Sequence, residues 1–246
     1  MTLSWTAYLF TMLASVGGGF VQATTGFGYG IFVMMFFPLY LSILESSALS
    51  QAISLFLLVS LTWRYRKYIR LKDVILPAAV YLVVSTALIL FATGFDFWIL
   101  SIVFACVMIV LALYMLFFSQ RIRIKAGPVS AIVCSTLSGA ASGLFGIGGP
   151  PMTLYYMTLY GGDKYVYLGT LQCFFLVTNL SNNVVRLANG ILSPALLLLV
   201  IPGVIGQAAG AWIGNRVLPR IPVDKFRYVV YGFLVISGII TLVTKL

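Results

Sequence analysis

One glycine-rich stretch decides how this chain folds. It reads Ser138-Gly139-Ala140-Ala141-Ser142-Gly143-Leu144-Phe145-Gly146-Ile147-Gly148-Gly149-Pro150-Pro151. Inside a helix, glycine costs about 1 kcal/mol relative to alanine and proline about 3 kcal/mol, so one continuous helix is disfavoured here. Earlier in the chain, Gly17-Gly18-Gly19 is followed by Gly26, Gly28 and Gly30. Both tracts therefore predict broken helices or re-entrant hairpins.

The sequence around these tracts is strongly apolar. Hydrophobic residues make up 61% of the 246 residues and charged residues only 8%, whereas soluble domains carry about 25% charged residues. Ten apolar segments can be marked, at residues 3–22, 26–44, 46–64, 74–94, 97–118, 128–145, 150–161, 165–187, 194–214 and 226–245. Most are long enough to cross a bilayer as helices. We therefore expect an all-α polytopic membrane protein in which residues 1–246 form a single transmembrane domain.

The two glycine tracts belong to an internal repeat. Matching features recur at similar spacings: residues 24–30 and 144–150, Gln51 and Gln172, and Pro77 and Pro202. The halves 1–120 and 121–246 each hold five segments, and because five is odd the second half is inverted in the membrane. Inverted repeats are a frequent plan of secondary transporters, which bind substrate at the repeat interface near mid-membrane.

Positive charge orients the segments. The loop at residues 64–72 holds five cations, and loops rich in Lys and Arg stay in the cytoplasm. Counting spans from this loop puts 13 of the 15 cations on the cytoplasmic side and leaves Arg186 and Lys245 outside. Both termini are then expected outside a multi-pass protein of the cytoplasmic (inner) membrane. The same distribution explains the net charge of +10 without a nucleic-acid partner.

The glycine tracts are the first candidate site. If two hairpin tips meet at mid-membrane, bare backbone N–H groups and helix N-termini are offered to an anion. The candidate residues are Gly26, Gly28, Gly146, Gly148 and Gly149. The alternative is tight helix packing through small residues, as in Gly139-x-x-x-Gly143. For Gly206-x-x-x-Gly210-x-x-x-Gly214 we favour packing or a subunit contact, which leaves a homodimer possible.

A polar stripe on segment 165–187 is the second candidate. Gln172, Asn179, Asn183 and Arg186 share one helical face, and Gln51 stands at the position that matches Gln172. Polar side chains also join helices, but the recurrence of the two glutamines favours substrate contact, with both aimed at a common centre. Arg186 lies near the outer helix end. It is expected either to attract the anion at the outer mouth or to snorkel to the interface.

Enzyme, metal and cofactor chemistry find no support in the sequence. The chain has no His, its three Cys stand alone, and no buried pair of acids offers acid–base chemistry. Proton coupling through Glu45 remains open. Sodium coupling through unwound backbone carbonyls near the glycine tracts also remains open. We expect no cofactor, no metal and no enzymatic activity.

The glycine tracts resemble those of the sulfite exporter TauE/SafE family, the TSUP permeases. Residues 138–151 are similar to the family's G-x-x-x-G-x-x-G-x-G-G element and the proline-bearing helix after it. Residues 16–30 look like a degenerate first copy, with Tyr29 and Gly30 where the second copy has Gly149 and Pro150. Residues 201–214 resemble the family's later glycine-rich helix, so the likeness covers essentially the whole chain. The departure in the first copy leaves open whether both hairpins contact substrate equally.

This resemblance implies transport of sulfite, thiosulfate, sulfoacetate or related organosulfonates across the cytoplasmic membrane. We therefore expect a secondary transporter, an exporter of a small sulfur-containing anion that works by alternating access. A passive small-anion channel and an uptake permease are the alternatives. The expected partners are the anionic substrate and the lipid bilayer.

Overall fold

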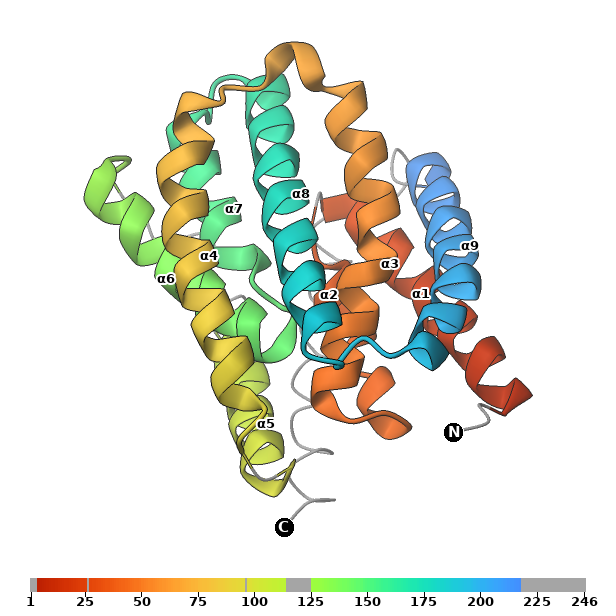
Figure 1. The fold of residues 1–246 in the computed structure, drawn as a ribbon. Coiled ribbons are helices and arrows are strands. Elements are labelled where there is room, and N and C mark those ends of the chain that lie inside the picture. Colours follow the sequence, from red (N-terminus) through yellow and green to blue (C-terminus); the bar gives the residue numbers. More distant parts are fainter. Residues whose placement is uncertain (1–3, 26, 96, 114–124, 218–246) are drawn as a thin grey trace.

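The computed structural model describes residues 4–25, 27–95, 97–113 and 125–217. These residues form nine α-helices and two 3₁₀ turns, η1 and η2 (Figure 1). In chain order they are α1 (Trp5–Thr25), α2 (Tyr29–Val33), η1 (Phe37–Leu39), α3 (Ile43–Arg64), η2 (Arg66–Tyr68), α4 (Lys72–Ala92), α5 (Phe97–Leu113), α6 (Pro128–Phe145), α7 (Gly149–Leu159), α8 (Lys164–Ala188) and α9 (Pro194–Val217). The helical fold class is confirmed. Eight of the predicted segments correspond to α-helices of at least 11 residues, whereas segment 26–44 contains only the five-residue α2 and the turn η1. The tenth, 226–245, lies outside the described residues.

Local sequence explains where several helices begin. Ser42 and Glu45 form a reciprocal capping box at the start of α3, in which each side chain bonds the other's backbone N–H. The Asp163 carboxylate caps α8 by accepting from the N–H groups of Tyr165 and Val166. Prolines occupy the first turns of α6 and α7, where no intrahelical N–H is needed.

Several helices have the length and composition of membrane spans. Among the described residues, four helices are long and apolar enough to cross a bilayer: α3, α4, α6 and α9. Their outer faces carry large apolar side chains, such as Val83 on α4, which is 71% exposed, and Ile201 on α9, which is 63% exposed. Such faces suit lipid rather than water.

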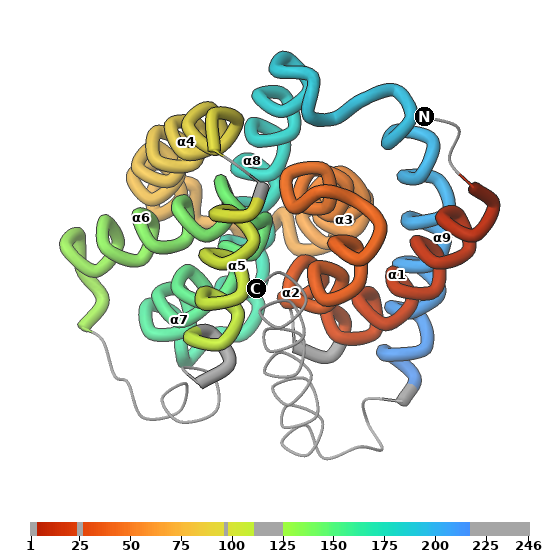
Figure 2. The backbone as a smooth tube through the Cα atoms, turned by 90° about the horizontal axis from the view of Figure 1, so that it is seen from below, coloured from red at the N-terminus to blue at the C-terminus, as the bar shows by residue number. Residues whose placement is uncertain are grey.

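Two pairs of helices pack through small residues. On α9, a Cβ added at Gly210 would lie 1.9 Å from the Val16 carbonyl of α1, and one at Gly206 would lie 2.2 Å from the Met12 carbonyl. On α6, a Cβ added at Gly143 would lie 2.7 Å from the Ser85 carbonyl of α4. The packing interpretation of both small-residue motifs is confirmed. Figure 2 shows the two pairs on opposite sides of α3 and α8.

Each glycine tract joins a long helix to a short helix that turns back. After α2 and η1 the chain returns to α1, where the Tyr40 hydroxyl lies 2.8 Å from Thr11 Oγ1. After α6, helix α7 runs back toward the start of α4, and the Tyr156 hydroxyl donates to the Asp73 carbonyl at 3.0 Å. Segments 3–22 and 26–44 therefore form one hairpin, and segments 128–145 and 150–161 form another. Their tips lie in the interior.

The basic connections gather at one edge of the molecule. The Tyr68 ring stacks on Tyr165 at a centroid distance of 5.2 Å, and the Arg70 N–H donates to Thr170 Oγ1 at 3.1 Å. These contacts join the loop after α3 to the start of α8. Figure 1 shows the end of α9 at the same edge and the start of α1 at the opposite edge. The cations of residues 64–72, the start of α8 and the end of α9 thus share one end of the bundle.

Candidate functional site

The two hairpin tips touch each other. Gly28, before α2, and Gly146, after α6, both adopt left-handed backbone, with φ of 100° and 72°. Residues with a Cβ rarely adopt this conformation, so both turns depend on glycine. A Cβ added at Gly30 would lie 2.7 Å from the Gly146 carbonyl oxygen, and one at Gly149 would lie 3.3 Å from the Phe27 ring. The two helix breaks, which are far apart in the sequence, are therefore packed against each other.

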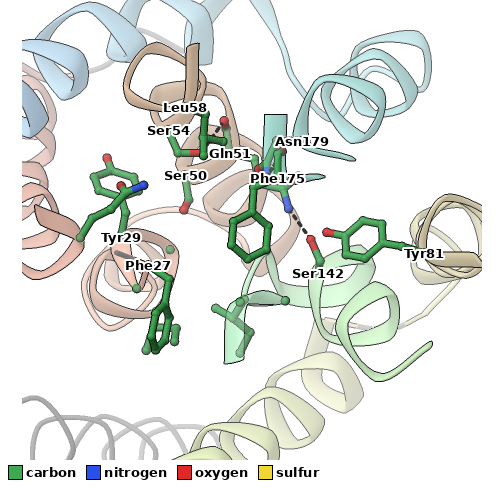
Figure 3. A pocket seen from close by; sticks show the side chains of 18 residues that line it. Phe27, Tyr29, Ser50, Gln51, Ser54, Leu58, Tyr81, Ser142, Phe175 and Asn179 are labelled. Carbon is green, nitrogen blue, oxygen red and sulfur yellow. Dashed lines mark hydrogen bonds between the residues drawn. The ribbon is translucent and has the colours of Figure 1, made fainter. Parts of the chain in front are cut away.

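A small cavity lies beside this contact (Figure 3). Its volume is about 60 Å³, several times the ~10–15 Å³ that one water molecule needs. Of the residues predicted from sequence, six line it: Gly28, Gly146, Gly148, Gly149, Gln51 and Asn179. Among the described residues, its lining contains no charged side chain. The space suits a compact solute held by neutral groups.

Gln51 is the most firmly oriented polar group of this cavity. Its Oε1 accepts a hydrogen bond from Arg186 Nη1 at 2.7 Å, and its Nε2 donates to Ser142 Oγ at 2.6 Å. The dashed line between Gln51 and Ser142 in Figure 3 marks the second bond. Because the oxygen is bound on one side, the NH₂ group must face Ser142 and the cavity. Gln51 therefore acts as a hydrogen-bond donor on the cavity side.

Ser142 connects Gln51 to a longer buried chain. Its hydroxyl also accepts from Asn182 Nδ2 at 3.3 Å, and Asn182 Oδ1 accepts from Ser85 Oγ at 2.8 Å. The Tyr81 hydroxyl points toward Ser142 in Figure 3. Helices α3, α4, α6 and α8 are thus tied together by polar groups behind the cavity. Such a network fixes the positions of the lining groups.

Arg186 does not occupy the outer mouth, so that expectation was wrong. Its side chain is 0% exposed and does not line the cavity. Besides Gln51 it donates to the backbone carbonyls of Ser47, Ser142 and Gly143, at distances of 3.0–3.1 Å. Two of these carbonyls belong to the last turn of α6. Sequence placed Arg186 near a helix end, but the tertiary contact with α6 provides it with acceptors and removes any need to snorkel.

Gln172 does not share a centre with Gln51, contrary to the sequence-based expectation. It is buried but does not line the cavity. Each glutamine lies eight residues after the start of its helix, about 12 Å along it, and α3 and α8 run in opposite directions. The two glutamines therefore lie at different levels of the bundle. Gly26 lies outside the described residues.

Sequence reasoning missed several cavity residues, namely Gln22, Ser50, Tyr81, Ser142 and Phe175. Gln22 is held by Gln207 of α9, whose Nε2 donates to Gln22 Oε1 at 3.2 Å, so Gln22 also keeps its NH₂ group available. The Ser50 hydroxyl is buried without a hydrogen-bond partner in the described part of the chain. The signal for Gln22 was its place inside the first glycine tract, between Gly19 and Gly26. Ser142 stood within the second tract.

The chemistry on offer is binding by neutral donors. Gln51 and Gln22 present amide N–H groups and Ser50 presents a hydroxyl, which together can replace part of an anion's hydration shell. No group of three or more His, Cys, Asp or Glu side chains that could hold a metal is found among the described residues. Glu45, considered above as a proton carrier, is engaged in the capping box of α3.

Comparison with known proteins adds one match. The family model for the sulfite exporter TauE/SafE family matches residues 11–241, nearly the whole chain. No curated protein and no solved structure matches the chain.

Proposed function

Because this chain belongs to the sulfite exporter TauE/SafE family, a family of membrane transporters, we propose that it exports a small sulfur-containing anion across the cytoplasmic membrane. The substrate is sulfite, thiosulfate or a C2 organosulfonate of the sulfoacetate or taurine type. The observation that carries this proposal is the cavity at the meeting point of the two hairpins. Its small volume and its neutral donors suit a compact anion.

The transport mechanism that fits this site is alternating access by two inverted repeats, 1–120 and 121–246, in one transmembrane domain. Helix packing supports the repeat. Helix α1 packs on α9 as α6 packs on α4, and α3 contacts α9 as α8 contacts α4. If α1, α3 and α4 are matched with α6, α8 and α9, the α1–α9 contact has its counterpart in α6–α4, and the α3–α9 contact has its counterpart in α8–α4. In such transporters the substrate site lies between the repeats, where the Gly30–Gly146 contact is found.

The cytoplasmic side is the edge that carries the basic connections. Cations at residues 64–72, Lys164 and Arg216 support this orientation, since loops rich in Lys and Arg are retained in the cytoplasm. Both termini then face outward. From the cavity, the lining residues Ser54 and Leu58 continue along α3 toward the basic edge, which suits loading of an exported anion from the cytoplasm.

Purified protein in liposomes tests the function. Vesicles holding the same concentration of sulfite, thiosulfate, sulfoacetate or taurine inside and outside are given an ion gradient, and net movement of the anion is followed with and without that gradient. An exporter moves at least one of these anions against its own gradient when a driving ion gradient is imposed. Movement that only ever follows the anion's gradient would identify a passive channel. Accumulation in the cytoplasmic direction would identify an uptake permease.

A thermal-shift screen provides the matching binding test. A ligand that binds the folded protein raises its melting temperature by mass action. We expect a rise with one of the sulfur anions and a smaller one with acetate. A response restricted to cations or neutral sugars contradicts the proposed substrate class.

A further inference from the structure

Arg186 sits in a cage of oxygen atoms built from two helices of opposite halves. Its Nη1 donates to Ser47 O at 3.1 Å and to Gln51 Oε1 at 2.7 Å, both on α3. Its Nη2 donates to Ser142 O and Gly143 O, both at 3.0 Å and both in the last turn of α6. Four acceptors thus surround a guanidinium that has no exposed surface.

The charge of this guanidinium is balanced without a carboxylate. In the described part of the chain, its hydrogen bonds go to three backbone carbonyls and one amide oxygen, and it forms no ion pair. Arginine stays protonated under physiological conditions. The carbonyls at the end of α6 carry the negative end of that helix dipole, which stabilises a cation there. The cage is therefore built for a positive charge.

Oxygen cages of this kind have a known use in membrane transporters. Where a helix is broken inside the membrane, unwound carbonyls and the C-terminal ends of half-helices coordinate the coupling cation. Helix α6 ends at the second glycine tract, and its terminal carbonyls are the ones that Arg186 occupies. A covalently attached cation is already present where a coupling ion would be bound.

We propose that Arg186 is a resident cation that takes the place of a coupling sodium ion at the α6 hairpin, so that transport by this protein does not require sodium. The claim that transport does not require sodium rests on the proposed transport function, whereas the oxygen cage around Arg186 does not. The position of Arg186 also has a consequence for the cavity. By bonding Gln51 Oε1, the guanidinium turns the amide NH₂ toward the substrate side. Arg186 acts through Gln51 and is a positioning residue.

Chemical rescue tests the cage without any transport assay. Arg186→Ala removes the guanidinium and leaves four acceptors around a space of its shape. Millimolar guanidinium, far below denaturing concentrations, should raise the melting temperature of Arg186→Ala relative to choline chloride at the same ionic strength. It should not do so for the wild type or for Arg216→Ala. Arg216 is the matched control because it is exposed and lies over the Trp212 ring at 3.9 Å. Absence of any rise specific to Arg186→Ala overturns the assignment of the cage.

A second pair of variants covers the case in which Arg186→Ala does not fold. Arg186→Lys keeps a cation in the cage, whereas Arg186→Met has a similar length and no charge. The Lys variant should melt at a higher temperature than the Met variant. Equal melting temperatures, or a more stable Met variant, contradict a cage that requires positive charge.

The claim that transport does not require sodium is tested on the wild-type protein in liposomes. Replacing sodium by choline on both sides should leave the rate of sulfur-anion transport unchanged. A loss of transport on sodium removal, with guanidinium rescue intact, would refute the replacement of sodium while keeping the cage. Transport of no anion under any condition would instead contradict the proposed function, and the melting experiments would still decide the role of Arg186.

Discussion

Gln51 Oε1 accepts a hydrogen bond of 2.7 Å from Arg186 Nη1, although the two residues are 135 positions apart in the chain. The bond joins α3 to α8, two helices that run in opposite directions. It also determines which end of the Gln51 amide faces the cavity, because the nitrogen then points to Ser142, 2.6 Å away. A neutral side chain thereby becomes a dedicated donor beside a buried positive charge.

The first prediction concerns the two glutamines. Gln51→Ala removes a donor from the cavity and should weaken binding of the sulfur anion by about 1–2 kcal/mol, roughly 5- to 30-fold in Kd. Gln172→Ala is the matched control, because Gln172 is equally buried but does not line the cavity. Calorimetric titration of both purified variants measures the difference. Equal losses of affinity would show that the glutamines act only in helix packing.

The second prediction concerns the contact between the hairpins. Gly30→Ala introduces a Cβ that would lie 2.7 Å from the Gly146 carbonyl, so the tips must move apart. Transport in liposomes should fall strongly, while the yield of membrane-inserted protein changes less. Gly162→Ala provides the control, since a Cβ there meets nothing within 4 Å. Normal transport by Gly30→Ala would show that the hairpin tips do not line the substrate pathway.

The helices were predictable because their signals are local. Pro128 fits the first turn of α6 and Gly146 supplies the left-handed residue after its end, so the predicted range 128–145 agrees with the structure. The small-residue spacing of Gly206, Gly210 and Gly214 likewise indicated packing before its partner helix was known. Continuous hydrophobicity and helix breakers suffice for features of this kind.

The site was only partly predictable because it depends on which helices meet. A cation near a helix end usually reaches the interface, and nothing local in the sequence indicates that the end of α6 supplies acceptors to Arg186. Gln51 and Gln172 also stand equally far from the starts of α3 and α8, and because these helices run in opposite directions the two side chains lie at different levels. Single polar residues such as Gln22 and Ser142 acquire a role only through tertiary contacts.

The third prediction concerns the packing of α1 on α9. Gly210→Ala places a Cβ 1.9 Å from the Val16 carbonyl, which is backbone and cannot move aside without shifting a helix. The cost should be about 1–3 kcal/mol of stability, the usual range for overpacking. The melting temperature of the purified protein measures it. Gly127→Ala, where a Cβ meets nothing within 4 Å, should melt like the wild type.

The fourth prediction concerns orientation. In a background in which Cys106, Cys134 and Cys173 are replaced by alanine, Lys67→Cys should resist an impermeant thiol reagent in intact cells and react after lysis. Phe95→Cys, in the connection after α4 at the opposite edge, should react in intact cells. The reason is the retention of basic loops in the cytoplasm. Labelling of Lys67→Cys from outside would reverse the proposed topology.

The fifth prediction separates binding from stability at Ser50. Ser50 lines the cavity, and the residue is 1% exposed. Its hydroxyl has no hydrogen-bond partner in the described part of the chain. Removing a buried polar group without a partner does not cost stability, so Ser50→Ala should melt at or above the wild-type temperature.

The same substitution deletes a donor that a desolvated anion needs, so anion affinity should fall by about 1–2 kcal/mol. Ser85→Ala is the opposite case, because its hydroxyl donates to Asn182 Oδ1 at 2.8 Å and lies outside the cavity lining. It should lower the melting temperature more than it lowers affinity. Melting curves and titrations of both variants form the experiment. A Ser50→Ala protein with wild-type affinity would show that the unpartnered hydroxyl is not kept for the substrate.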